Sequence, residues 1–275
     1  MNPMRTPPTA TDPFGAHLRH WRQHRRLSQL ELANEAQVST RHLSYVETGR
    51  AEPSREMVLR LAERLEVPLR ERNALLVAAG YAPMYRQRSL DDPALAAARR
   101  AVDLVLKGHE PFPALAIDRH WKLIAHNAMV PLLMTGAAPH LLEAPINVLR
   151  LSLHPDGLAP RIANLAQWRA HLLERLQQQI AATGDATLSA LHDELAAYPP
   201  PQVSHDAPAV GGELAHVVVP FQLATAAGVL SFISTTTIFG TPADVTLQEL
   251  AVESFFPADA QTAQALAVLS VRAQG

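Results

Sequence analysis

Residues 28–49, SQLELANEAQVSTRHLSYVETG, have the pattern of two short helices joined by a tight turn. Ser28 and Glu31 have the spacing of a capping box, in which each side chain satisfies a backbone amide at the helix start. Ser39 offers a cap for the second helix, and Gly49 is the residue type that ends a helix in the left-handed conformation. Helices this short are not stable alone, so we expect neighbouring helices to pack against them.

Amphipathic helices flank this pair on both sides. Before it, Phe14, Leu18 and Trp21 recur with helical spacing. After it, residues 54–65 repeat apolar side chains on one stripe, and residues 69–79 form a fifth segment that ends at a glycine. Five short helices can bury each other's apolar faces. The sequence therefore predicts an all-α five-helix domain.

The second helix of the pair carries hydrogen-bonding side chains on its outer face. Thr40, Arg41, Ser44 and Tyr45 alternate there with the inward-facing apolar residues. Such side chains suit base edges and phosphates, which is how a helix-turn-helix uses its recognition helix. The pattern therefore favours DNA binding.

This segment resembles the Xre/lambda-repressor-like helix-turn-helix family over nearly its whole length. The motifs that carry the resemblance are S-Q-x-E-L-A in the second helix, S-x-x-x-L-S-x-V-E-x-G in the third, and P-S at the start of the fourth. The resemblance implies that Gln29 contacts DNA, and that Glu47 is a buried acid paired with Arg22. The family often has Gln where this chain has Thr40 and Arg41, so the target sequence cannot be taken from a relative.

We expect the DNA contacts to come from both helices of the pair and from two flanking arginines, Arg19 and Arg50, which are placed to meet phosphates. One head reads only a few base pairs, so a homodimer on a double-stranded operator with an inverted repeat is the expected complex. The expected DNA-contacting residues are Ser28, Gln29, Ser39, Thr40, Arg41, Ser44, Tyr45, Arg50 and Arg19.

Charge and length indicate a second domain that does not bind DNA. A chain of 275 residues usually forms two domains. Residues 14–88 carry 13 arginines against 8 acidic residues, whereas residues 89–275 carry 10 basic against 17 acidic residues. A basic module joined to an acidic one fits a DNA-binding head on a separate body.

Composition excludes several classes of protein. The chain has no cysteine, which excludes disulfide bridges and thiolate chemistry. It has no run of about 18 apolar residues, as a membrane-spanning helix would need, and its start lacks the apolar stretch of a signal peptide. We therefore expect a cytoplasmic, nucleoid-associated protein with no membrane partner.

The domain boundary is expected where periodicity is lost. Residues 81–92 show no consistent period and end before Pro93, a residue typical of helix starts. We predict a disordered tail at residues 1–13, the helix-turn-helix domain at residues 14–80, a linker at 81–92, and a second domain at 93–275.

The second domain has the pattern of an α+β fold with an antiparallel sheet and helices on one face. Two extended runs around Asp118 and Arg119 predict a hairpin. A long helix is expected at residues 159–182, and Asp259 is placed to cap a final helix. The order of these elements is similar to a PAS-type sensor. Strands are expected at residues 216–224, 228–239 and 247–256.

The second domain also resembles the MmyB-like transcription regulators. The resemblance is carried by D-R-x-W at 118–121 leading to Asn127, W-R-A-H-L-L at 168–173, H-D-E-L at 192–195, and the long block FISTTTIFGTPADVTLQELAVESFFPAD at 232–259. The C-terminal domain of that family is regarded as a ligand-binding module. The resemblance implies an apolar effector, with fatty-acyl compounds as one class.

Large aromatic side chains around a small sheet make an apolar pocket plausible. Each of these aromatic residues, considered alone, is most simply explained as part of the hydrophobic core. The Ser234–Thr237 run has two interpretations, as a pocket lining with hydroxyls from alternate residues or as a half-exposed strand. The expected ligand-binding residues are Trp121, Asn127, Trp168, Phe232, Ser234, Thr236 and Phe255.

Two histidine groups resemble metal motifs but lack complete ligand sets. His17, His20 and His24 share one helix face, yet a structural zinc site wants four ligands and usually thiolates. His192 begins a zincin-like fragment that has no second histidine at the required spacing. We expect no metal and no cofactor.

The sequence leaves three functions for the second domain. An enzyme would need a convergent acid/base or nucleophile set, which the sequence does not offer, so we expect a non-enzyme. The favoured hypothesis is a one-component transcription factor whose second domain senses a small apolar effector. The alternative is a second domain that serves only dimerisation or partner recruitment, and an internal cavity would separate these two.

Overall fold

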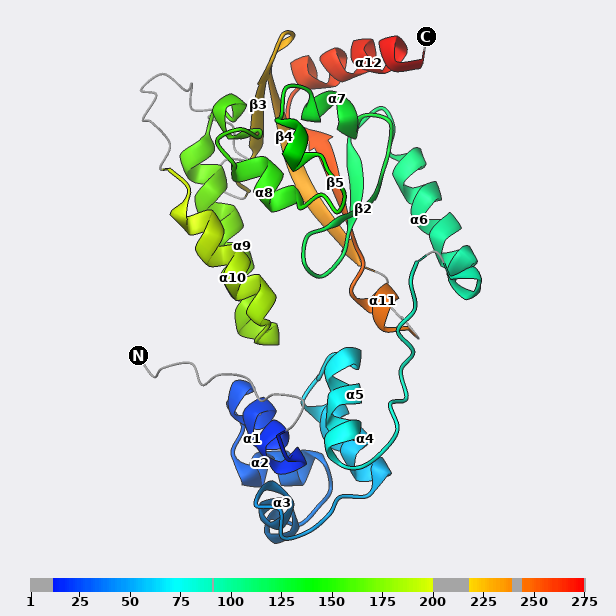
Figure 1. The fold of residues 1–275 in the computed structure, drawn as a ribbon, viewed down its shortest axis with the longest axis vertical. Helices are drawn as coiled ribbons and strands as arrows, with labels where there is room; N and C mark the ends of the chain where they lie inside the picture. The colour runs from blue at the N-terminus through cyan, green and yellow to red at the C-terminus, as the bar shows by residue number, and fades with distance from the viewer. Residues whose placement is uncertain (1–11, 91, 200–217, 239–243, 275) are drawn as a thin grey trace. The chain divides into compact units, whose positions relative to one another are not determined.

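The protein divides into two compact units (Figure 1). The first unit runs to Arg88 and also includes the segment that ends at Gln248, and the second begins at Ser89 and contains the rest. Of the predicted N-terminal tail, residues 1–11 lie outside the described residues. The computed structural model describes residues 12–90, 92–199, 218–238 and 244–274.

Five helices surround one apolar core in the first unit. Leu18, Leu32 and Leu43 from the first three helices are fully buried at its centre. Gly15 allows the first and third helices to approach, because a Cβ atom there would collide with the carbonyl oxygen of Glu47. The five-helix prediction is confirmed. The helices are α1 (Phe14–His24), α2 (Gln29–Glu35), α3 (Thr40–Glu47), α4 (Arg55–Arg64) and α5 (Leu69–Ala78).

The first part of the predicted linker is bound to the first unit. Asn73 of α5 accepts hydrogen bonds from the backbone N–H groups of Met84, at 2.9 Å, and Tyr85, at 3.0 Å, and donates to the Tyr85 carbonyl at 2.7 Å. The Tyr81 hydroxyl donates to the carbonyl of Pro53 at 3.0 Å. Side-chain hydrogen bonds hold this segment, and they leave no periodic signal in the sequence.

The second unit is an α+β fold, as predicted, built on a five-stranded antiparallel sheet in the order β2-β1-β5-β4-β3 (Figure 1). The longest strand, β4, pairs with β3 through a tight hairpin at Gly228 and with β5 from Phe232 opposite Pro257 to Ile238 opposite Ala251. The strands are β1 (Ala114–Ile117), β2 (Leu123–His126), β3 (Phe221–Thr225), β4 (Gly228–Ile238) and β5 (Ala251–Pro257).

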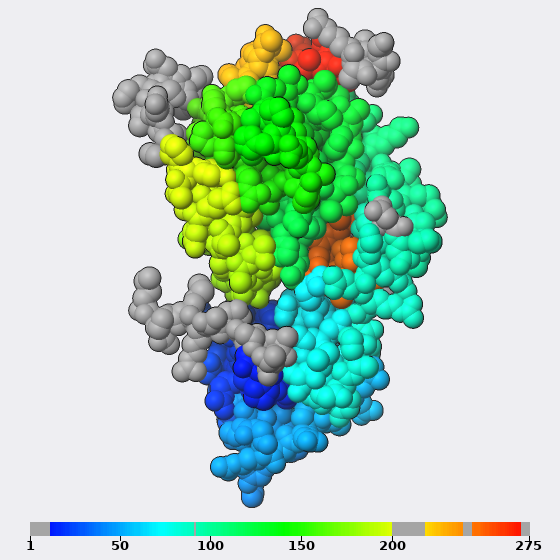
Figure 2. All heavy atoms as spheres, viewed as in Figure 1, coloured from blue at the N-terminus to red at the C-terminus, as the bar shows by residue number. Residues whose placement is uncertain are grey.

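Helices between β2 and β3 cover one face of this sheet, and their atoms hide most of it in Figure 2. The other face is covered in part, by α6 at β1, so helices lie on both faces and the prediction of helices on one face only is corrected. Leu115 and Ile117 of β1 belong to the main core, while Ala114 and Ala116 alternate to the opposite face and are also fully buried, where α6 contacts β1. The helices are α6 (Ala96–Gly108), α7 (Val130–Met134), α8 (Val148–Leu153), α9 (Leu165–Thr183), α10 (Ala186–Ala197), α12 (Ala260–Gln274) and three short 3₁₀ turns, η1 (Pro93–Leu95), η2 (Pro139–Leu141) and η3 (Ala159–Arg161).

Two predicted element boundaries are wrong, and the first is wrong for a tertiary reason. The helix expected from residue 159 begins at Leu165, because Ile162 forms a bridge with Leu223 and the Ala163 N–H donates to the Gln222 carbonyl at 2.9 Å. Residues 162 and 163 therefore pair with the edge strand β3 and do not form the first turn of α9.

The strand expected at residues 247–256 begins at Ala251, and a short helix, α11 (Val245–Gln248), precedes it. Asp244 caps that helix by accepting from the Thr246 N–H at 2.9 Å. Of the strand expected at 216–224, residues 216 and 217 lie outside the described residues, and β3 begins at Phe221. No helix in the described part of the chain is long and apolar enough to cross a membrane.

Candidate functional site

Hydrogen-bonded caps fix the starts of the two helices of the helix-turn-helix. The Ser28 hydroxyl accepts from the Glu31 N–H at 3.2 Å, and the Ser28 N–H donates to the Glu31 carboxylate at 2.7 Å. The Ser39 hydroxyl accepts from the His42 N–H at 3.2 Å. Ser28 and Ser39, expected at the DNA, therefore also set the direction in which α2 and α3 leave the turn.

The outer face of α3 is polar and accessible. Its inner side buries Leu43 and Val46, whereas Arg41 is exposed and Thr40, Ser44 and Tyr45 are partly exposed. The Arg41 Nε–H donates to the Tyr45 hydroxyl at 3.0 Å, and its guanidinium lies 5.4 Å from the centre of the Tyr45 ring. Arg50 is exposed just beyond the helix end. The structure thus gathers the expected recognition residues on one face.

A buried ion pair joins α1 to α3. The Nε–H and Nη2–H groups of Arg22 donate to the two carboxylate oxygens of Glu47 at 2.6 and 3.0 Å, which is the two-pronged geometry of a strong charge-assisted pair. The Glu47 side chain is 0% exposed. Arg22 also donates to the Leu27 carbonyl at 2.9 Å, so it holds the chain between α1 and α2 as well.

Two residues expected at the DNA also face Glu47. The Gln29 side-chain amide donates to its carboxylate at 2.8 Å, and Arg19 approaches it at 3.6 Å. Burial raises the pKa of the Glu47 carboxyl, but the hydrogen bonds from Arg22 and Gln29 and the neighbouring positive charges outweigh it, so the pKa lies below its ordinary value. Gln29 and Arg19 therefore have a structural contact that their sequence positions did not reveal.

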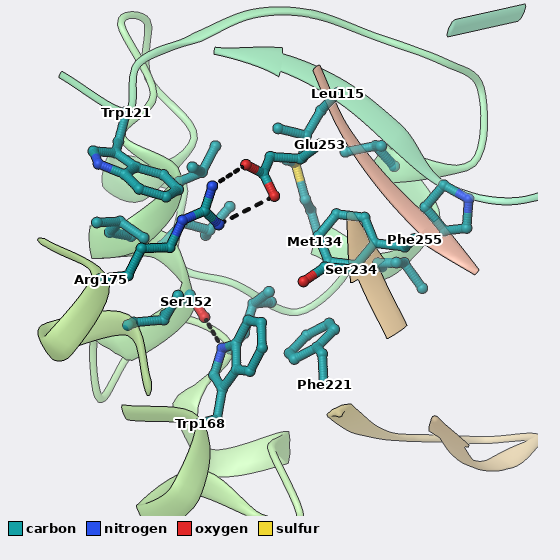
Figure 3. Close-up of a pocket in the computed structure, with 18 residues that line it drawn as sticks. Leu115, Trp121, Met134, Ser152, Trp168, Arg175, Phe221, Ser234, Glu253 and Phe255 are labelled. Atoms are coloured by element: carbon teal, nitrogen blue, oxygen red, sulfur yellow. Dashed lines mark hydrogen bonds and ion pairs between the residues drawn. The ribbon is translucent and has the colours of Figure 1, made fainter. Parts of the chain in front are cut away.

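A mostly apolar cavity lies inside the second unit, between the sheet and the helices that follow β2 (Figure 3). The space open to the centre of a water molecule is about 90 Å³, and the space between atoms, counted with its mouth, is about 730 Å³. The indole rings of Trp121 and Trp168 line it, and the side chains of Leu115, Met134 and Phe255 are part of its apolar surface (Figure 3).

The indole N–H groups of the walls are already satisfied. Trp121 donates to the side-chain oxygen of Gln179 at 2.8 Å, and Trp168 donates to the Ser152 hydroxyl at 3.0 Å. Both indole N–H groups therefore donate to protein side chains and are not free to bind a ligand. The rings present apolar surface to the cavity.

One polar corner interrupts this apolar lining. Arg175 of α9 donates to the two carboxylate oxygens of Glu253 at 2.6 and 3.3 Å, and its guanidinium lies 4.6 Å from the Trp121 ring centre (Figure 3). Thr236 accepts from Arg175 at 2.6 Å and donates to Glu253 at 2.9 Å. The corner therefore offers charged and hydroxyl groups in a fixed arrangement.

Four of the expected ligand-binding residues line the cavity, namely Trp121, Trp168, Ser234 and Phe255. Thr236 lies at its polar corner through the hydrogen bonds to Arg175 and Glu253. Strand alternation places Ser234 and Thr236 on one face of β4, so the hydroxyl run contributes every second residue to the site.

The structure gives two expected ligand residues other roles. Asn127 is buried, donates to the Leu106 and Phe112 carbonyls at 3.2 and 2.7 Å, and accepts from the Ala114 N–H at 3.2 Å. These backbone groups use its amide and give Asn127 a structural role, while its expected contact with a ligand stays a prediction. Phe232 is fully buried and stacks on Phe221, with ring centres 6.0 Å apart, so it belongs to the solid core.

Sequence reasoning missed the charged pair of the cavity. Glu253 lies in a strand of otherwise apolar and small residues, and Arg175 follows Trp168 by seven positions on α9, which is the same helix face. A single acidic residue on the inward face of a predicted strand indicates that a basic residue is buried beside it. The sequence alone does not say which of its arginines supplies that partner.

His17, His20 and His24 of α1 are not among the described side chains that group with metal-ligand spacing. His20 and His24 stack with ring centres 6.2 Å apart, and burial and the neighbouring His24 lower the pKa of His20. Within the described residues, one group of three side chains has metal-ligand spacing, namely His140, His154 and Asp156. The His154 Nδ1 atom there already accepts the Asp156 N–H at 3.0 Å.

Comparison with known proteins agrees with this division. The model of a helix-turn-helix domain matches residues 13–75, and the model of the MmyB-like transcription regulator ligand binding domain matches residues 98–269. The chain belongs to the MmyB-like transcription regulators. No curated protein is similar enough to this chain to count as a match. This MmyB-like protein is therefore a transcription regulator with a DNA-binding helix-turn-helix and a ligand-binding domain.

Proposed function

We propose that this MmyB-like regulator is a one-component sensor, in which an apolar effector in the cavity adjusts operator binding by a homodimer. The cavity is the observation that carries the proposal. A well-packed core leaves few voids larger than one water molecule, and one water needs only about 10–15 Å³ of such space. This cavity offers about 90 Å³. Its walls suit an alkyl chain, and fatty-acyl compounds are the class that the family resemblance implies.

The effector is proposed to act by differential affinity for two placements of the heads. A ligand shifts a conformational equilibrium only when it binds one state more tightly. Two heads of a dimer bind half-sites about 34 Å apart, one turn of DNA, so a change in head spacing alters operator affinity. Such a regulator works at the nucleoid, in the cytoplasm.

The proposal is tested by identifying what the protein carries. The purified full-length chain is extracted with organic solvent, and the extract is analysed by mass spectrometry for an amphiphilic molecule present in molar proportion. Operator affinity is then measured with and without that molecule. If no such molecule co-purifies and added fatty acids do not change the operator affinity, the sensor proposal is wrong. Dimerisation or partner recruitment would then remain as the role of the second domain.

Arg41 is expected to read a base edge in the major groove, because it is exposed on the outer face of α3. Arg41→Ala should relax the preference at one operator position by about 1–3 kcal/mol. The measurement is selection of binding sites from random DNA by the wild type and the variant.

Arg50→Ala is the matched control for this prediction. It removes the same charge just beyond the helix end, where a phosphate contact is expected, and should weaken all sequences evenly. If Arg41→Ala also weakened every sequence alike, Arg41 would be a phosphate contact and the assignment to a base would be wrong.

A further inference from the structure

The short helix α11 connects two strands of the sheet in the second unit, but it belongs to the first unit, which carries the helix-turn-helix. In sequence it lies between β4 and β5, within the region that matches the ligand-binding domain. In the structure it groups with the first unit, next to α5. The chain therefore leaves the second unit after β4, contributes α11 to the first unit, and returns to the second unit at β5.

Specific contacts hold α11 within the first unit. The Val245 N–H donates to the Arg86 carbonyl at 2.9 Å, and the Val245 side chain is buried. The Thr246 hydroxyl donates to the Arg88 carbonyl at 2.5 Å. These bonds fasten the segment to the stretch that follows α5.

Gln248 makes the contact with the most direct consequence for α5. The first N–H groups of a helix have no acceptor within the helix. Pro68, the residue before α5, provides no side-chain cap. The side-chain oxygen of Gln248 accepts the Leu69 N–H at 2.7 Å instead. A residue of the β4–β5 connection thus caps a helix of the DNA-binding unit.

The same connection leads directly to the effector cavity. Gln248 is three residues before Ala251, the first residue of β5, so the backbone between them can span at most about 11 Å. Two residues further on, Glu253 holds Arg175 at the polar corner of the cavity, and Phe255 lines its apolar wall. Only two residues, Glu249 and Leu250, thus separate the Gln248 cap from the strand that lines the cavity.

We propose that α11 is the coupling segment of this regulator. Occupation of the cavity displaces β5 at Glu253 and Phe255, and the displacement changes the Gln248 cap on Leu69 and with it the placement of α5. This inference rests on the proposed function, because it requires that an effector binds in the cavity and alters DNA binding.

The test uses the full-length chain, palmitate as the apolar probe, and an operator obtained by selection from random DNA. In the wild type, palmitate should change the operator Kd by a factor in the usual range of roughly 5–150-fold. Gln248→Ala should reduce that factor to less than roughly threefold, while its Kd for palmitate without DNA stays within about twofold of the wild type. Thr246→Val, which removes the hydroxyl donated to Arg88, should reduce the factor in the same way.

Two matched variants control the result. Gln248→Glu keeps an acceptor at the Leu69 N–H and should retain the coupling, whereas Gln264→Ala removes an exposed glutamine of α12 and should change nothing. As a measurement independent of any variant, palmitate should increase amide hydrogen exchange in the first turn of α5 of the wild type.

The possible failures are distinguishable. A wild type whose operator affinity ignores palmitate overturns the proposed function, and this inference with it. A wild type that responds, together with Gln248→Ala and Thr246→Val variants that respond equally, overturns the coupling role of α11 alone. Unchanged exchange at Leu69 in a palmitate-responsive wild type also overturns it.

Discussion

Replacing Glu47 with alanine is expected to destabilise the DNA-binding unit by about 3–5 kcal/mol, because the substitution leaves the buried Arg22 without its partner. The carboxylate is fully enclosed and also accepts a hydrogen bond from Gln29. The measurement is denaturant-dependent hydrogen exchange of the α1 and α3 amides in the full-length chain. Glu35→Ala, at an exposed glutamate of α2, is the control and should leave that stability nearly unchanged.

The Glu47 contribution should depend on pH in a defined direction. The pKa of its carboxyl lies below the ordinary value of 4.5 in the folded chain. The ionised form therefore stabilises the fold above pH 4.5, and this stabilisation is lost as the pH falls through the depressed pKa. The stability difference between wild type and Glu47→Ala should shrink in that acid range.

A different outcome would assign Glu47 to DNA contact. Unchanged amide protection in Glu47→Ala together with lost operator binding would mean that the residue acts on the operator directly. The structural interpretation of the Arg22 pair would then be wrong.

Filling the cavity with Ser234→Trp is expected to abolish effector binding and the effector's influence on DNA. Ser234 lines the cavity, so an indole placed there occupies the space that a ligand needs. A fall from micromolar affinity to beyond the millimolar range corresponds to a loss of at least about 4 kcal/mol. Palmitate binding is measured by calorimetry, and operator affinity without palmitate should stay near that of the wild type.

Thr235→Trp is the matched control for bulk. Thr235 is the next residue on β4, exposed, and points to the opposite face of the sheet. It should bind palmitate as the wild type does, and both variants are checked by thermal unfolding. Palmitate binding by a folded Ser234→Trp protein would place the ligand outside this cavity and contradict the sensor proposal.

The helix-turn-helix could be predicted almost completely from sequence. Its signals are local, since Ser28 and Glu31 are one helical turn apart and Ser39 caps the helix that it precedes. The Arg22–Glu47 pair is not local, and only the family resemblance pointed to it. The contact between Gln29 and Glu47 was missed because residues 18 positions apart share no periodic pattern.

The sequence predicted the fold class of the ligand-binding domain but not the details of its structure. Alternating apolar residues indicated the strands of an antiparallel sheet, and Trp121, Trp168, Ser234 and Phe255 were correctly placed near one another. The structural role of Asn127 could not be predicted, because a buried amide that binds backbone groups and one that binds a ligand look the same in a sequence. The start of α9 was misplaced because β3 captures Ile162, which sequence spacing does not show.

The sequence by itself determined the segments whose cause lies within a few residues, such as the caps of α2 and α3 and the alternation of β4, because backbone hydrogen bonding and side-chain period act over that range. The tertiary structure alone decided which distant groups meet. Arg175 and Glu253 are 78 positions apart and form the polar corner of the cavity, and Gln248 caps a helix that begins 179 positions earlier. Such pairs depend on how the chain closes long loops around a core, and a buried charge or an uncapped amide can be satisfied by any suitable partner that the fold brings near.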